Sequence, residues 1–156
     1  MSDKSMKYYG KPRARYMAKL DGIFEAVEVD SFYLRKLLYQ TISMIEKATG
    51  DPELSFGYVI ERKTFSGEAG EVTEDSDIIL DSESLKKYED DVVMAIIAHE
   101  LAHYHLEHYD GSRTDFLAME HEADDMARKW GFDVDKFRRI CGEPTCSICP
   151  GDSLGD

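Results

Sequence analysis

The sequence predicts an α+β fold in which a small mixed sheet packs against a buried helix, with a further helix after it. The chain of 156 residues is long enough for one domain with a real core and too short for two. Two segments rich in β-branched or aromatic residues, 55–64 and 77–81, lie between turn signals and are expected to be strands. A helical segment, residues 90–108, follows them and is apolar nearly all round in its first two turns.

The first predicted element is an amphipathic helix over residues 31–49. Its apolar residues recur at helical spacing, and Asp30 or Ser31 can cap its start. Gly50 and Pro52 end it, because neither residue continues a helix well.

The remaining elements follow from turn signals and apolar periodicity. The polar segment 66–76 is expected to connect the two strands as a loop or hairpin. The helix over 90–108 is apolar around most of its first two turns, which is typical of a buried helix. A second helix is expected to run to about Trp130, and a short helix from Asp133 ends the folded part. Three polar residues can cap the second helix: Ser112, Thr114 and Asp115.

The charge of the chain is uneven. Residues 1–20 hold six Lys or Arg and one acid, a net charge of +5, so the rest carries −18 and the total is −13. We expect residues 1–20 to be a flexible basic arm that can fold back onto the acidic body, with binding to nucleic acid or a membrane as the alternative. The acidic body itself argues against nucleic-acid binding, because phosphate contacts need clustered cations.

The C-terminal residues 141–156 are rich in Cys, Gly and Pro and form a predicted loose tail. They hold all three cysteines, Cys141, Cys146 and Cys149, which cannot form a complete set of disulfides. Three thiols are also one short of the four ligands of a closed zinc site. We expect a reduced tail, with a small metal or redox clip as the alternative, and a single domain over residues 21–140.

No segment of the sequence has the length of a membrane span. The longest purely apolar run, Val92–Ala98, has seven residues. The N-terminal segment lacks the apolar core of a secretory signal. We therefore expect a cytoplasmic location with no membrane span.

The motif HELAH, on the buried helix, contains His99, Glu100 and His103. A separation of four residues turns a helix by about 400°, so both imidazoles leave the same face and can bind one metal ion. Glu100 lies about 100° around the helix from His99, within reach of a water on that ion. The spacing thus predicts two ligands and a general base.

A catalytic zinc site needs a third protein ligand and an open position for water. Glu120 and Asp124 fall on the apolar stripe of the next helix, where a carboxylate needs a cation or a hydrogen-bond partner. We expect Glu120 to be the third ligand and Asp124 to accept the free ring N–H of a ligand histidine. His121 and Glu122 are the alternatives to Glu120, and they are expected at the rim and toward solvent.

Two further histidines of the buried helix, His105 and His108, are extra ligand candidates. Helical geometry rotates them about 200° and 140° away from His103, so we expect them at the surface or rim. The acidic segment 68–91 is expected to be a solvated face, with selection of basic substrates as the sharper interpretation.

The two motifs together, HELAH followed by EHEAD, resemble the gluzincin metallopeptidases, in which a Glu-x-x-Ala-Asp motif supplies the third ligand. Residues 76–135 are similar to the minimal zincin domains of the HtpX and CAAX-prenyl-protease-like family and of the ImmA/IrrE-type peptidases. The resemblance implies a zincin-like fold with these roles: Zn²⁺ on His99, His103 and Glu120, water activation by Glu100, and support of a ligand histidine by Asp124. Two features of those families are not found in the sequence: transmembrane helices and a DNA-binding helix-turn-helix.

The expected function is that of a zinc-dependent metallopeptidase, an endopeptidase acting on protein or peptide substrates, basic ones if the acidic segment contributes. The edge of the strand Ile78–Leu80 is expected to align an extended peptide. The alternative is a catalytically inactive zincin-fold regulatory or interaction module, with structural zinc and an acidic partner-binding surface. Four residues remain candidates for the oxyanion donor: Tyr104, Tyr109, Arg128 and Arg138.

Overall fold

Four strands form a mixed sheet in this computed structural model, which describes residues 14–63 and 69–144. The strand order is β1-β2-β4-β3; β1, β2 and β4 are parallel, and β3 is antiparallel to β4. The predicted α+β class with a small mixed sheet is confirmed. The strands are β1 (Phe24–Glu28), β2 (Phe56–Arg62), β3 (Gly70–Val72) and β4 (Ile78–Asp81).

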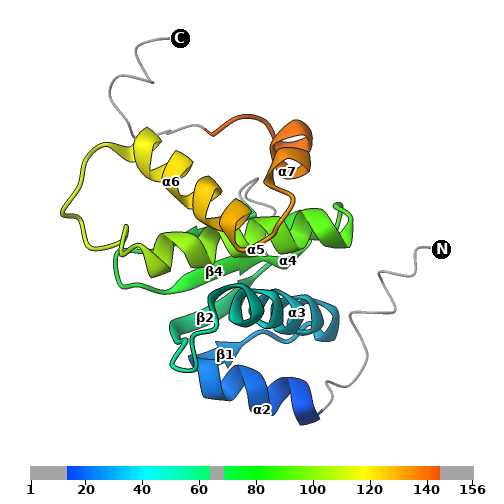
Figure 1. Ribbon diagram of the computed structural model, residues 1–156. Helices are drawn as coiled ribbons and strands as arrows, with labels where there is room; N and C mark the ends of the chain where they lie inside the picture. Colours follow the sequence, from blue (N-terminus) through cyan, green and yellow to red (C-terminus); the bar gives the residue numbers. More distant parts are fainter. Residues whose placement is uncertain (1–13, 64–68, 145–156) are drawn as a thin grey trace.

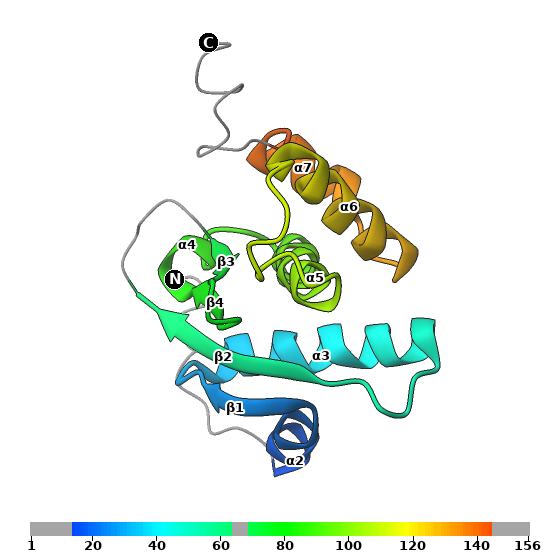
Figure 2. The same cartoon turned by 90° about the vertical axis from the view of Figure 1, so that its left-hand side faces the viewer.

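Helix α5 is the central element of the fold. It contacts α3, α6, α7 and the strands β2, β3 and β4. Figures 1 and 2 show the sheet on one side of α5 and the pair α6 and α7 on the other. Ten of its sixteen residues are buried, which confirms the prediction of a buried helix. The described residues form six helices: α2 (Ala14–Ile23), α3 (Phe32–Thr49), α4 (Ser82–Leu85), α5 (Asp90–His105), α6 (Phe116–Lys129) and α7 (Val134–Cys141).

The N-terminal part differs from the sequence prediction. Residues 14–20, which were assigned to a flexible arm, belong to α2, and Leu20 is fully buried in the core. Lys19 pairs with Glu46 of α3 at 2.5 Å. Apolar burial and this ion pair fix the helix, so the prediction was wrong for these residues. Residues 1–13 of the predicted arm lie outside the described residues.

Strand β1 was not predicted at all. Its sequence FEAVE has one buried aromatic residue and two exposed glutamates, without a strict alternation of apolar and polar residues. Such a short segment does not stand out from a loop. The parallel partner β2 supplies what the local sequence lacks, because Phe24 aligns with Phe56 and their rings lie 5.7 Å apart. The pairing across about thirty residues of chain therefore decides this strand.

Helix α3 forms as predicted. Of the two cap candidates it is Ser31 whose side chain accepts a hydrogen bond, from the N–H of Leu34 at 3.2 Å. Gly50 ends the helix with a positive φ of 64°, and its N–H donates to Glu46. The carboxylate of Glu61, on β2, accepts from the backbone N–H groups of Asp30 and Ser31, which anchors the helix start to the sheet.

The C-terminal helices also follow the prediction, with one boundary changed. Asp115 is the residue that precedes α6, and Asp133 caps α7 by accepting from the N–H of Lys136 at 3.1 Å. Helix α5 ends at His105 instead of His108. Cys146 and Cys149 lie outside the described residues, and Cys141 is exposed at the end of α7. Among the described residues, no helix is long and apolar enough to cross a membrane.

Candidate metal centre

Three side chains predicted as metal ligands converge between α5 and α6. The Nε2 atoms of His99 and His103 lie 3.1 Å apart. Glu120 places Oε2 at 2.6 Å from Nε2 of His103 and Oε1 at 3.3 Å from Nε2 of His99. Within the described residues, this trio is the group of three or more potential ligands whose atoms all lie within 4.8 Å of one another.

The three side chains form a donor set that could hold a tetrahedral metal ion such as zinc. Zinc binds histidine nitrogen at about 2.0–2.1 Å, so two ligand atoms of a tetrahedral site lie about 3.3–3.4 Å apart. The separations of 3.1 Å between the two Nε2 atoms and 3.3 Å between Nε2 of His99 and Oε1 of Glu120 are close to that value. The distance of 2.6 Å between Nε2 of His103 and Oε2 of Glu120 is that of a direct hydrogen bond, and it would lengthen around an ion. The imidazole nitrogens of His99 and His103 and the carboxylate of Glu120 would supply the three protein ligands of such an ion.

Asp124 holds His99 in the orientation that ligation requires. Its Oδ1 lies 2.8 Å from Nδ1 of His99, and both side chains are buried. A carboxylate at Nδ1 fixes the proton on that nitrogen and leaves the Nε2 lone pair for a metal. The structure thus brings Asp124 to the position that the sequence predicted.

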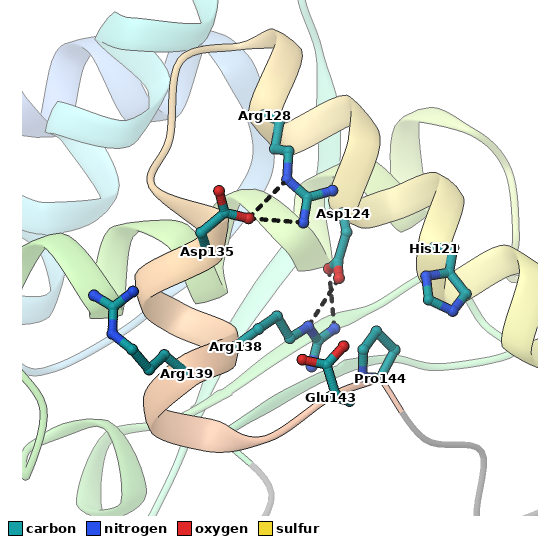
Figure 3. Close-up of a pocket in the computed structure, with 8 residues that line it drawn as sticks. All are labelled: His121, Asp124, Arg128, Asp135, Arg138, Arg139, Glu143 and Pro144. Atoms are coloured by element: carbon teal, nitrogen blue, oxygen red, sulfur yellow. Dashed lines mark hydrogen bonds and ion pairs between the residues drawn. The ribbon is translucent and has the colours of Figure 1, made fainter.

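Arg138, on α7, holds Asp124 in turn. Its Nε donates to Oδ2 of Asp124 at 2.8 Å, and its Nη2 donates to Oδ1 at 2.9 Å. Figure 3 shows the guanidinium reaching across from α7 to this carboxylate, beside a pocket of about 460 Å³. Arg138 also approaches Oε1 of Glu120 at 3.9 Å. Helix α7 therefore stabilises the site through a forked charge-assisted contact.

Glu100 is buried beside the ligands, with 7% of its surface exposed. Burial raises the pKa of its carboxyl, although the nearby imidazoles of His99 and His103 oppose the shift. Strand β3 covers it closely: a Cβ built on Gly70 would lie 2.9 Å from Cγ of Glu100. A raised pKa suits a general base, because a more basic carboxylate takes up the proton of a water molecule more readily.

The histidines and carboxylates of the site shift one another's pKa values. Burial lowers the pKa of His99, but the hydrogen bonds to Asp124 and Glu120 outweigh it and raise the pKa to about 9. Burial alone would raise the pKa of Glu120, but the hydrogen bonds from His103 and His99 bring it far below its ordinary value. The carboxylate is therefore ionised at neutral pH, as a metal ligand must be.

His108, expected at the surface or rim and turned away from the ligands, instead points at His103. Its side chain is 3% exposed, and its Nδ1 lies 2.9 Å from Nδ1 of His103. The helical rotation used for the prediction does not apply, because α5 ends at His105 and the chain reverses at Glu107, with φ 58°. No local sequence signal marked this turn, since a glycine at Glu107 would have been the usual one.

The other ligand candidates lie where the sequence predicted them, and Glu122 in addition forms ion pairs that were not predicted. His105 is exposed and packs edge-on against Trp130, with 5.7 Å between the ring centroids. His121 is exposed and lines the pocket of Figure 3. Glu122 is 42% exposed in its side chain, and it pairs both with His108 at 3.0 Å and with Arg113 at 2.7 Å.

The candidate oxyanion donors are largely engaged elsewhere. Tyr104 stacks on Tyr109 with ring centroids 5.2 Å apart. Arg128 pairs with Asp125 and Asp135, at 2.9 and 3.0 Å. Arg138 approaches a proposed ligand, because its Nη2 lies 3.9 Å from Oε1 of Glu120.

The strand expected to align a peptide is not an edge strand. Residues 78–81 form β4, which pairs with β2 on one side and with β3 on the other. The prediction was wrong because the segment 66–76, expected as a loop or hairpin connection, contains β3. Among the strands of residues 14–63 and 69–144, the outermost on this side of the sheet is β3, at Gly70–Val72.

No protein-family model, curated protein or solved structure matches the chain. The assignment of a function therefore depends on the two motifs and on the geometry that they form.

Proposed function

We propose that this protein is a zinc-dependent metallopeptidase with a zincin-like domain, as the resemblance of its motifs to the gluzincins suggests. The observation that carries the proposal is the convergence of His99, His103 and Glu120 on one point, 2.6 to 3.3 Å between ligand atoms. The buried acid Glu100 lies on the same helix as the two histidines. Three ligands with a neighbouring base form the donor set of a catalytic zinc site.

The residues divide the chemistry between them. A bound zinc ion would polarise a carbonyl oxygen and lower the pKa of its water to about 7. Glu100 would accept the proton of the attacking water and return it to the leaving amine, a general acid–base role for which its raised pKa is suited. Asp124 would keep His99 in the ligating tautomer, and Arg138 would keep Asp124 in place.

The free edge of β3 is the proposed docking line for an extended peptide. Backbone groups on an open sheet edge pair with an added strand. Gly70 of β3 touches Glu100, so a peptide paired there would lie beside the proposed base. Basic substrate residues and a cytoplasmic location stay predictions of this proposal.

Metal content and peptide hydrolysis test the proposal. Protein purified without chelators should contain about one zinc per chain, and the zinc-loaded protein should cleave members of a broad fluorogenic peptide library. Glu100→Gln should keep the zinc and lose activity by about 10²-fold or more, since it removes the base but no ligand. Glu25→Gln, which changes an exposed glutamate of β1, is the matched control and should be fully active.

Two outcomes would contradict the enzyme. If zinc-loaded wild type and Glu100→Gln are equally inert on the library, zinc is structural and the interaction-module alternative holds. If the purified protein contains no zinc and His99→Ala leaves its melting temperature unchanged, the chain is a metal-free structural protein.

A further inference from the structure

The end of α5 folds the chain back onto a proposed ligand. The backbone N–H of His108 donates to the carbonyl of His103, and that of Glu107 donates to the carbonyl of Tyr104, both at 3.0 Å. With Glu107 at φ 58°, these two bonds form a Schellman motif, in which Glu107 is residue C′ and His108 is residue C″. Such a motif brings the C″ side chain against residue C3 of the helix, which here is His103.

The contact that this turn creates is polar. The rings of His103 and His108 lie 5.1 Å apart at a steep angle, with their Nδ1 atoms at 2.9 Å. The other nitrogen of His108, Nε2, lies 3.0 Å from Oε1 of Glu122 on α6. The side chain of His108 is 3% exposed and that of Glu122 is 42% exposed, so both contacts of His108 are partly buried.

Ligation by His103 would fix the position of each proton in the hydrogen-bonded series His103, His108 and Glu122. The Nε2 atom of His103 faces Glu120 and His99, so as a ligand it carries no proton, and the proton is on Nδ1. Nδ1–H then donates to Nδ1 of His108, which makes Nε2 of His108 the protonated nitrogen and a donor to Glu122. Each nitrogen therefore has one role, and no group is left unsatisfied.

Arg113 fixes Glu122, the last residue of this hydrogen-bonded series. Its Nη1 and Nη2 donate to the two oxygens of Glu122, both at 2.7 Å. It also pairs with Asp115 at 2.5 Å, so the loop before α6 is tied to the same carboxylate. The fork holds Glu122 in a geometry that points Oε1 at His108.

We propose that His108, backed by Glu122 and Arg113, is a positioning residue that holds His103 in the ligating tautomer and orientation. It would serve His103 as Asp124 serves His99. The two ligand histidines would then be supported from different elements: His99 from α6 and α7, and His103 from the turn after α5. This inference depends on the proposed metal site, and it adds to that site a residue that neither motif contains.

The experiment measures zinc affinity of the full chain by competition with a chromophoric chelator. His108→Leu removes the acceptor and should weaken zinc binding by about 10–100-fold, the usual cost of losing the partner of a ligand histidine. His108→Asn should stay within about threefold of wild type, because Asn Oδ1 stands where His Nδ1 stands and accepts the same bond. His121→Leu, an exposed histidine next to Glu120, is the matched control and should bind as wild type does.

A spectroscopic readout separates positioning from general structural damage. In protein loaded with Co²⁺, the visible absorption band should shift or lose intensity in His108→Leu and return in His108→Asn. Glu122→Ala provides a second variant for the case that His108→Leu does not fold. The side chain of Glu122 is 42% exposed, so its removal opens no core cavity, and zinc affinity should fall about 3–10-fold.

The failures are distinguishable. Wild type that binds neither Zn²⁺ nor Co²⁺ overturns the proposed metal site, and this inference with it. Wild type that binds zinc while His108→Leu has equal affinity and an equal cobalt spectrum overturns the positioning role alone. The same follows if His108→Asn is as weak as His108→Leu, or if folded Glu122→Ala binds zinc as tightly as wild type.

Discussion

Zinc binding by this chain should depend steeply on pH, because the ion and a proton compete for Nε2 of His99. The hydrogen bonds of His99 to Asp124 and Glu120 overcome the effect of burial and raise its pKa to about 9. Below that pH, zinc must displace a proton from the metal-free site. The competition makes the apparent dissociation constant about 100-fold larger at pH 7, and about tenfold larger at pH 8, than for a fully deprotonated site.

Two measurements check this prediction. Chelator competition between pH 6 and pH 8 should show the affinity rising about tenfold per pH unit, and calorimetry in two buffers should show about one proton released per zinc. Asp124→Asn is the informative variant: it removes the charge that raises the pKa of His99, so the pH dependence should become shallower. An affinity that is flat between pH 6 and pH 8, with no proton release, would refute the reasoning.

The same shift has a consequence for the stability of metal-free protein. A histidine whose pKa is higher in the folded state stabilises the fold below its unfolded pKa, and that stability is lost as the pH rises through the folded value. For His99 the window runs from about 6.5 to about 9, and the loss is on the order of 3 kcal/mol. Chelator-treated protein should therefore melt at progressively lower temperature across this window, and zinc-loaded protein should not follow it.

Two substitutions probe the surroundings of the site. Gly70→Ala places a Cβ 2.9 Å from Cγ of Glu100, so peptide hydrolysis should fall about tenfold or more while zinc affinity stays within about threefold; Gly22→Ala, with nothing within 4 Å, is its control. Equal activity of the two alanine variants would contradict the close packing on Glu100. Arg138→Met leaves the buried Asp124 without its forked partner and should lower the free energy of unfolding by about 1–3 kcal/mol in urea titration. Arg138→Lys should lose less, and no loss in either variant would show that the fork contributes nothing.

The helical part of the site was predictable from the sequence because helix geometry is rigid. Within α5, the i, i+4 spacing of His99 and His103 fixes their relative direction whatever surrounds them. The same holds for Glu120 and Asp124 on α6. Helix geometry alone does not show that the histidine face of α5 packs against the carboxylate face of α6. Two carboxylates on the apolar stripe of α6 indicated this packing indirectly, because they need a cation or a hydrogen-bond partner.

The parts that depend on chain reversals were not predictable. His108 was misplaced because its direction was computed along a helix that ends three residues earlier. The turn that places it is set by the positive φ of Glu107, a residue type that seldom marks such a turn. Likewise β3 lies in a polar segment, and its pairing with β4 moved the free sheet edge from Ile78–Leu80 to Gly70–Val72.

The charged groups of the site explain why a metal ion and protons would compete for it. Glu100, Glu120 and Asp124 contribute three negative charges and Arg138 one positive charge, which leaves −2 when the histidines are neutral. Glu100 and Asp124 are buried and Glu120 is partly buried, so this excess of negative charge is costly unless cations offset it, and one divalent ion would match it in charge. Without the ion, protons are the remaining cations, and the raised pKa values of His99 and Glu100 are the expected response. A divalent ion would therefore offset this charge, and two imidazoles with one carboxylate form a donor set of the kind that zinc accepts.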